Sequence, residues 1–164
     1  MKKKGFTLIE LIVVIAIIGV LTGILVPAML GYIRKAKITA ANSGASQVIK
    51  TANIMLSEQE EDFALEDGRY ALNCTAEQAS GGAFGDIEEE VEQYILEFDD
   101  SLTELPFALQ IEEGFAVAAA TKNGKYFGTY PAHLTHKNYN TELPDPSLGN
   151  ALDLAYSVYQ TKKS

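Results

Sequence analysis

The feature that most constrains this chain is an uncharged apolar run near its amino terminus. From Leu11 to Leu30 there are 20 consecutive residues without a charge, mostly Ile, Leu, Val and Ala. As a helix with a rise of about 1.5 Å per residue, this run extends about 30 Å, the thickness of a bilayer core. The sequence therefore predicts a membrane-spanning helix.

Basic residues flank this run on both sides, so the charge count does not fix its orientation. Lysines stand at positions 2 to 4, and Arg34, Lys35 and Lys37 follow the run. A cleaved secretory signal peptide is the alternative, but its apolar region is shorter and ends at a small-residue cleavage site that is not evident here. We expect a retained anchor with a cytoplasmic amino end, from which at most a few residues are removed.

Glu10 interrupts the apolar sequence four residues after Phe6. An ionisable residue in a bilayer-facing helix costs up to a few kcal/mol and usually marks function. A carboxylate is favoured near a helix amino end, where unpaired N–H groups and the helix dipole place positive charge. If the chain were cut after Gly5, the new amine of Phe6 would lie one helical turn from Glu10. Pairing of Glu10 with its own amino end at i, i+4 is the structural alternative.

The stretch KKKGFTLIELIVVIAIIGVLTGILVP resembles the leader and amino-terminal helix of type IV pilins and the related pseudopilins. The short basic leader, Gly5, Phe6, Glu10 and the uncharged run coincide at the spacing of that family. The resemblance is close over roughly the first 30 residues and loose to about Leu56. Beyond residue 60 it concerns the architecture alone.

The resemblance implies a processing and assembly pathway for this amino end. A membrane-embedded prepilin peptidase would cleave between Gly5 and Phe6 and methylate the new amine of Phe6. Gly5 would be required because that peptidase tolerates only a small residue before the cut. Glu10 would pair with the Phe6 amine of a neighbouring subunit as subunits leave the membrane and join a filament.

Gly19, Gly23 and Pro27 are expected to weaken the helix locally. Glycine is a poor helix former, and proline removes a hydrogen bond and clashes with the preceding turn. A simple kink at Pro27 is the alternative. The resemblance to pilins implies a partly melted stretch in this zone of the filament. We therefore expect the helix to stretch here on assembly.

Beyond Tyr32 the helical periodicity continues with polar residues between the apolar ones. One apolar face is formed by residues at steps of three and four: Ile38, Ala41, Ala45, Val48, Ala52 and Met55. The sequence therefore predicts one helix from about Phe6 to about Ser57, apolar in its first half and amphipathic in its second. We expect a cleaved leader at 1–5, a transmembrane and filament-core helix at 6–30, the amphipathic half at 31–57 and a globular head at 58–164.

The head is predicted to contain about three antiparallel strands. Alternating and apolar runs place them at 107–111, 115–121 and 125–130, with a hairpin turn at Asn123-Gly124. One apolar face of this small sheet would pack on the amphipathic half of the long helix. The expected fold class is α+β, a long helix packed on an antiparallel sheet in a roll that resembles that of pilins.

The remaining parts of the head have weaker patterns. Residues 57–85 are polar and acidic and suggest a connecting loop with short helical pieces, and 86–98 suggest a helix capped by Asp86. Residues 129–150 are rich in turn formers and predict an exposed loop, followed by a short helix at 151–159. A lone Cys74 excludes an intrachain disulfide, so packing of the carboxy-terminal loop must come from side chains such as Tyr139, Leu143, Leu148 and Tyr156.

No pattern of catalytic residues is evident, so we expect neither an enzyme nor a cofactor. His133 and His136 could share a metal with Asp145 or Glu142 as a third ligand, but no further His or clustered Cys supports such a site. The candidates for a calcium site are Glu142, Asp145 and Asp153, since oxygen ligands in a flexible loop suit that ion. Ordinary turn chemistry is the favoured interpretation of these three acids. Asn73-Cys74-Thr75 matches a glycosylation sequon, a motif that is frequent by chance.

The net charge of −9 is unevenly distributed. Residues 57–113 carry 18 acids against one base, Arg69, and therefore a charge of −17. Such a block repels nucleic acid, so we do not expect nucleic acid as a partner. A basic patch formed by Lys122, Lys125 and Lys137 at one tip would weaken this argument.

The favoured function is a structural subunit of a type IV pilus. Its expected partners are further copies of itself, the prepilin peptidase, the pilus assembly platform and, before assembly, membrane lipid. We expect a single-pass prepilin in the inner membrane that later forms a filament at the cell surface. The alternatives are a pseudopilin of a type II secretion system, a DNA-uptake pilin and an envelope enzyme with a signal anchor.

Overall fold

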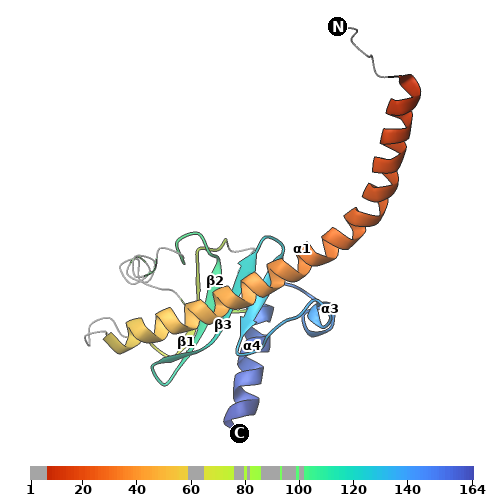
Figure 1. Ribbon diagram of the computed structural model, residues 1–164. Helices are drawn as coiled ribbons and strands as arrows, with labels where there is room; N and C mark the ends of the chain where they lie inside the picture. The colour runs from red at the N-terminus through yellow and green to blue at the C-terminus, as the bar shows by residue number, and fades with distance from the viewer. Residues whose placement is uncertain are drawn as a thin grey trace. The chain divides into compact units, whose positions relative to one another are not determined.

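The computed structural model describes residues 7–58, 65–75, 80, 82–85, 93, 99 and 102–164 (Figure 1). The chain divides into two compact units with a boundary after Lys35. The predicted long helix is confirmed as α1, Leu8–Glu58, which supplies residues to both units. Each unit is described by itself below.

A four-stranded antiparallel sheet forms the centre of the second unit, residues 36–164. Its strands follow one another in chain order, so that each pairs with the next. They are β1 (Gly68–Leu72), β2 (Phe107–Glu112), β3 (Phe115–Asn123) and β4 (Tyr126–Tyr130). The α+β class predicted from the sequence is therefore correct.

Both faces of the sheet are covered, whereas the sequence predicted a sheet with one apolar face. Residues of α1 from Ala45 to Met55 pack on one face, and the carboxy-terminal helix packs on the other (Figure 1). The cause lies in β3, whose run Ala116-Val117-Ala118-Ala119-Ala120 sends small apolar side chains to both faces. A continuous apolar strand is typical of a sheet buried on both sides.

The predicted stripe on α1 is confirmed. Ile38, Ala41, Ala45, Val48, Ala52 and Met55 are all buried, each at most 3% exposed. These residues lie against the sheet or the loops around it, so the amphipathic half of the helix docks where its pattern predicts.

Two-residue turns join the central strands. The predicted hairpin between β3 and β4 is confirmed, but its turn residues are Gly124, at φ 62°, and Lys125 rather than Asn123-Gly124, because Asn123 pairs with Tyr126. Glu113 and Gly114 join β2 to β3, both at positive φ, as a type I′ turn requires. The sequence analysis missed this second turn, because glutamate is seldom found in the left-handed region.

Strand β1 corrects the prediction that residues 57–85 form a loop with short helical pieces. Tyr70 and Leu72 alternate with outward residues and are buried, and β1 pairs with β2 at the edge of the sheet. A strand of five residues with two buried side chains has a weak sequence pattern, and this one lies within an acidic segment. The sequence analysis therefore missed it. The predicted helix at 86–98 lies outside the described residues, apart from Gln93.

The carboxy-terminal part is more ordered than predicted. The expected exposed loop at 129–150 contains α3 (Tyr139–Glu142) and the buried residues Leu134, Tyr139, Leu143 and Leu148. Tyr139, Leu143 and Leu148 pack as expected, with Tyr156 half-buried beside them. The last helix, α4, runs from Leu148 to Lys163 rather than 151–159, because Ser147 caps it by accepting a hydrogen bond from Asn150 N.

The end of α4 is tied to the β2–β3 turn by a polar cluster. Lys163 Nζ lies 2.7 Å from Glu112 Oε1, and Tyr156 and Gln160 each donate to Glu112 Oε2 at 3.1 Å. The hydrogen bond from Lys163 lowers the pKa of Glu112 and raises that of Lys163. This cluster fastens the last turn of α4 to the β2–β3 turn.

Helix α1 approaches the sheet very closely at Gly128 of β4. A Cβ built on Gly128 would lie 2.1 Å from the carbonyl carbon of Ala41 and from the backbone nitrogen of Asn42. Polar bonds fix the same contact: Thr121 Oγ1 donates to Ala41 O at 2.7 Å, and Asn42 Oδ1 accepts from Thr129 N at 3.0 Å. Only glycine fits at this point of the sheet.

We expect Gly128→Ala to destabilise the second unit by about 2–3 kcal/mol or more, because α1 must shift to admit the methyl group. Thermal unfolding of the full chain in detergent, followed by near-ultraviolet circular dichroism, checks this through a fall in Tm of roughly 5–10 °C. Gly31→Ala is the matched control, since no atom lies within 4 Å of its built Cβ. Equal stability of Gly128→Ala and the parent would contradict the close contact.

Candidate assembly site at the amino-terminal helix

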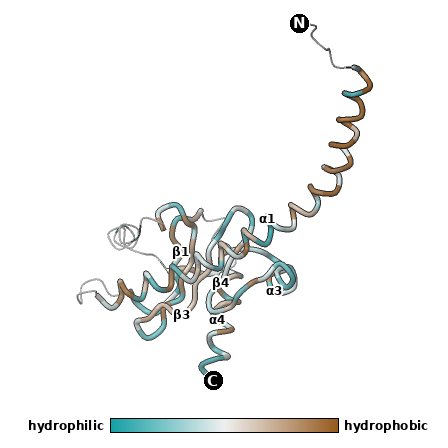
Figure 2. The backbone as a smooth tube through the Cα atoms, in the orientation of Figure 1, coloured by the Kyte–Doolittle hydropathy of each residue, from teal (hydrophilic) through white to brown (hydrophobic). Residues whose placement is uncertain are grey.

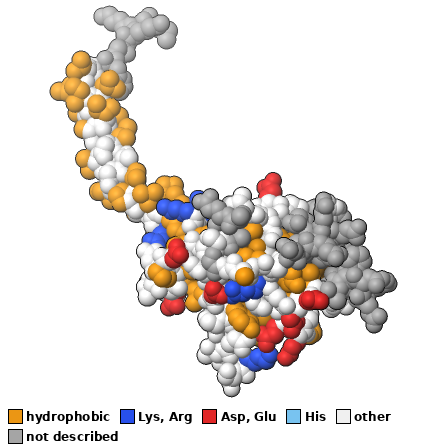
Figure 3. All heavy atoms as spheres, turned by 180° about the vertical axis from the view of Figure 1, so that it is seen from behind, with side chains coloured by type: hydrophobic (Ala, Val, Ile, Leu, Met, Phe, Trp, Pro, Cys, Tyr) orange, Lys and Arg blue, Asp and Glu red, His pale blue; other side chains and the backbone are white. Residues whose placement is uncertain are grey.

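The first unit presents an apolar helix surface that the described residues leave uncovered. Every large apolar side chain from Leu8 to Ile33 is exposed, with exposed fractions between 41% for Ile33 and 77% for Leu8. The helix is long and apolar enough to cross a membrane by length and composition. Figure 2 shows the apolar character along the segment, and Figure 3 shows hydrophobic side chains on one face of it.

Such a surface requires a covering medium. Burying a large apolar side chain stabilises by about 1.5–3 kcal/mol, so partial burial of so many is worth on the order of 20 kcal/mol. Contiguous exposed apolar patches of this extent mark membrane or protein contacts. The segment therefore functions only when lipid or other protein chains surround it.

Glu10 lies in the first turn of α1 and forms a capping box with Thr7. Thr7 N and Thr7 Oγ1 donate to Glu10 Oε2 at 2.8 and 2.7 Å, and Glu10 N donates to Thr7 Oγ1 at 3.4 Å. This is the reciprocal T-x-x-E arrangement, which satisfies donors left unpaired at a helix start. The sequence analysis considered a partner for Glu10 at i, i+4 and missed the one at i−3, which the Thr-Leu-Ile-Glu spacing signals.

The capping box leaves part of the carboxylate available. Both bonds from Thr7 end on Oε2, and Oε1 accepts none from the part of the chain that the structure describes. Glu10 also borders an open, shallow hollow whose other described lining residues are Ile9, Val13 and Val14. A cation that carries an apolar side chain would contact the carboxylate oxygen and the neighbouring apolar side chains at the same time.

Gly5 and Phe6, the predicted cleavage residues, lie outside the described residues. Gly19, Gly23 and Pro27 lie within α1, which is continuous through all three. A Cβ at Gly19 or Gly23 would meet no atom within 4 Å, so close packing within the chain does not explain these glycines.

The remaining candidates have structural partners. Asp153 pairs with Arg69, and Asp145 accepts from Asn150 Nδ2 through both its backbone and its side chain. Glu142 is exposed in α3. Among the described residues no three His, Cys, Asp or Glu side chains gather as a metal site would require.

The Asn73 sequon is likewise explained by structure. The side-chain amide of Asn73 donates to Leu102 O at 2.6 Å, and its backbone is at φ 54°. This amide therefore has a packing role at the end of β1, which disfavours a role as a glycan acceptor.

Comparison with known proteins gives one family match, the prokaryotic N-terminal methylation motif, over residues 1–26. The type IV major alpha-pilin of Moraxella bovis is 54% identical over 50 residues, which cover 30% of this chain and 31% of that protein. The type IV major fimbrial protein FimA of Dichelobacter nodosus is 34% identical over 92 residues, 51% of this chain and 59% of the relative. Prepilin peptidase-dependent protein D of Escherichia coli K12 is 58% identical over 38 residues, 23% of this chain and 26% of the relative.

These matches span between about a quarter and three-fifths of the length of the relatives. No solved structure matches the chain. The methylation motif covers the capping box and the first part of the exposed apolar helix. In its amino-terminal segment, this chain is similar to type IV pilins and carries the prokaryotic N-terminal methylation motif.

Proposed function

We propose that this chain is a structural subunit of a type IV pilus, made as a membrane-held prepilin and polymerised through its amino-terminal helix. The observation that carries this proposal is the exposed apolar helix with a capped carboxylate at its start. Lipid covers the helix before assembly, and neighbouring helices cover it afterwards. The names of the relatives, which are fimbrial and pilin proteins, support a structural rather than an enzymatic role.

Processing would take place between Gly5 and Phe6. The methylation motif spans this junction, and one relative is named for its dependence on prepilin peptidase. A methylated Phe6 amine stays cationic. In the filament it would meet the Glu10 carboxylate of a neighbouring subunit, and its ring would enter the apolar hollow beside Glu10.

Intact-mass analysis of material sheared from cells tests this function. We expect a species that begins at Phe6, lacks the five leader residues and carries one extra methyl group. Processed protein that stays in the membrane fraction would instead indicate a pseudopilin, against which the fimbrial names of the relatives argue. An unprocessed chain beginning at Met1 would contradict the proposal.

Two variants distinguish the assembly role of Glu10 from its capping role. We expect Glu10→Gln to be processed normally but to yield about tenfold fewer sheared filaments or less, because the neutral amide cannot neutralise the incoming amine. Thr7→Ala is the comparison, since it removes the capping hydroxyl and keeps the carboxylate. If both variants reduce filament yield equally, capping alone explains Glu10.

We propose further that α1 stretches between Gly19 and Pro27 on assembly. The open surroundings of both glycines and the proline within the helix support a locally weak segment. Amide hydrogen exchange should show faster exchange over residues 19–27 in filaments than over the flanking helix. Protection that runs unbroken from Val14 to Leu30 in the filament would contradict this.

A further inference from the structure

The carboxy-terminal end of the apolar surface on α1 changes character along one face of the helix. Leu25, Met29, Tyr32 and Lys35 follow one another at steps of four and three residues, so they lie on the same face. All four belong to the first unit and are exposed, Tyr32 to 74%. Within about 15 Å of helix, this face passes from aliphatic through aromatic to cationic.

The positions of Tyr32 and Lys35 correspond to the depth of lipid headgroups. The uncharged run ends at Leu30. If this run fills the hydrocarbon core, the backbone of Tyr32 lies about 3 Å beyond the core and that of Lys35 about 7.5 Å beyond it. The headgroup region is roughly 5–7.5 Å thick on each side of a bilayer. The tyrosine ring and the lysine ammonium therefore lie at the level of the glycerol and phosphate groups.

Both residue types suit this depth. Tyrosine is enriched at membrane–water interfaces, because its ring is apolar and its hydroxyl is polar. A lysine lays its alkyl chain along apolar surface and extends its ammonium into the headgroups. Lysine is nevertheless disfavoured on the side of a membrane away from the cytoplasm, where Lys35 stands if the amino end is cytoplasmic. A lipid phosphate at this depth would compensate that charge.

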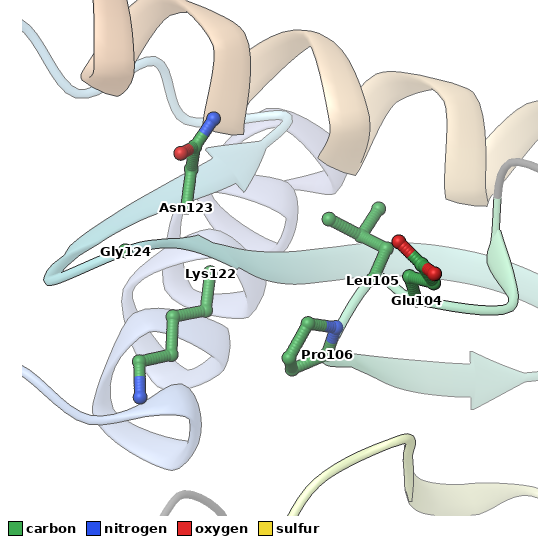
Figure 4. A pocket seen from close by; sticks show the side chains of 6 residues that line it. All are labelled: Glu104, Leu105, Pro106, Lys122, Asn123 and Gly124. Atoms are coloured by element: carbon green, nitrogen blue, oxygen red, sulfur yellow. The ribbon is translucent and has the colours of Figure 1, made fainter.

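Other lysines near this end of the helix have places in the second unit. Lys37 belongs to that unit, and its Nζ lies 3.4 Å from a Cβ built on Gly124 at the β3–β4 hairpin. Lys122 extends from the same hairpin away from α1, on the side opposite to Asn123 (Figure 4). We therefore confine the surface to Tyr32 and Lys35, which we name the interface pair.

We propose that the interface pair binds the headgroups of anionic phospholipids in the leaflet that faces away from the cytoplasm. The inference rests on the proposed function, because it concerns the membrane-held subunit before assembly. Lipid is favoured over other anions because the pair continues the apolar surface that lipid covers and lies at the depth of the phosphates. The contact sets how far α1 is inserted, and the subunit loses it on leaving the membrane.

Tryptophan fluorescence measures the insertion depth, because the chain contains no tryptophan of its own. The full chain with Tyr32→Trp is reconstituted in vesicles whose lipids carry bromine, a quencher, either near the headgroup or near the end of the acyl chain. We expect stronger quenching by the bromine near the headgroup. Ile18→Trp, near the middle of the apolar run, is the matched control and should show the opposite order. Any other order for Tyr32→Trp, or no quenching, would overturn the inference.

Native mass spectrometry tests the charge contact. The full chain is released from bilayers of equal parts phosphatidylcholine and phosphatidylglycerol, and we expect the retained lipid to be enriched in phosphatidylglycerol. Lys35→Gln should reduce this enrichment about threefold to fivefold, the effect of one basic residue near an anionic surface.

Lys50→Gln is the matched control for this measurement. It removes the same charge from an exposed lysine of α1 that lies about 22 Å further along the helix axis. Its enrichment should equal that of the parent, and the leader lysines are the same in all three chains. Equal enrichment in the parent, Lys35→Gln and Lys50→Gln would overturn the inference.

The outcomes separate this inference from the proposed function. Inorganic phosphate added before release should leave the enrichment unchanged, and its loss would overturn the inference by assigning the pair to a soluble anion. Absence of filaments from cells refutes the proposed function. Both reconstitution measurements need only an inserted chain, so they report on the interface pair alone.

Discussion

The uncovered apolar surface of α1 is the constraint on which the rest of this molecule depends. Between Leu8 and Ile33 no large apolar side chain is buried by the described part of the chain. Water is a poor medium for such a helix, so this surface needs lipid or other protein chains around it. In the proposed function, lipid covers it first and neighbouring helices cover it afterwards. The Thr7–Glu10 capping box lies at the start of this surface and satisfies the helix end while keeping one carboxylate oxygen available. A carboxylate kept in this way suits a contact that forms only when a neighbour arrives.

The second unit solves a different problem, that of docking a helix tightly on a sheet. Small residues on both partners allow it: Ala41 and Ala45 on α1, and Gly128 on β4. Buried hydrogen bonds from Thr121 and to Asn42 then fix the register between helix and sheet. Because α4 covers the opposite face, the sheet is enclosed on both sides, and the polar cluster at Glu112 and Lys163 fastens the last turn of α4.

The sequence predicted those features of the fold that local periodicity and short motifs encode. The long helix, its buried stripe from Ile38 to Met55 and the hairpin at Gly124 all follow from local patterns, and the amino-terminal motif indicated the family. Features set by tertiary context escaped it. Strand β1 depends on pairing with β2, the Glu113-Gly114 turn places glutamate at positive φ, and α4 begins at a cap that lies among turn formers.

The central claim is that the apolar half of α1 exchanges lipid for neighbouring copies of itself. A helical reconstruction of sheared filaments by electron cryomicroscopy tests it most directly. The account predicts that residues 8–33 of successive subunits pack together in the filament core, with each Glu10 beside the amino end of a neighbour and the heads outside. A filament held together by its heads, with residues 8–33 on the outer surface or in attached lipid, would contradict it.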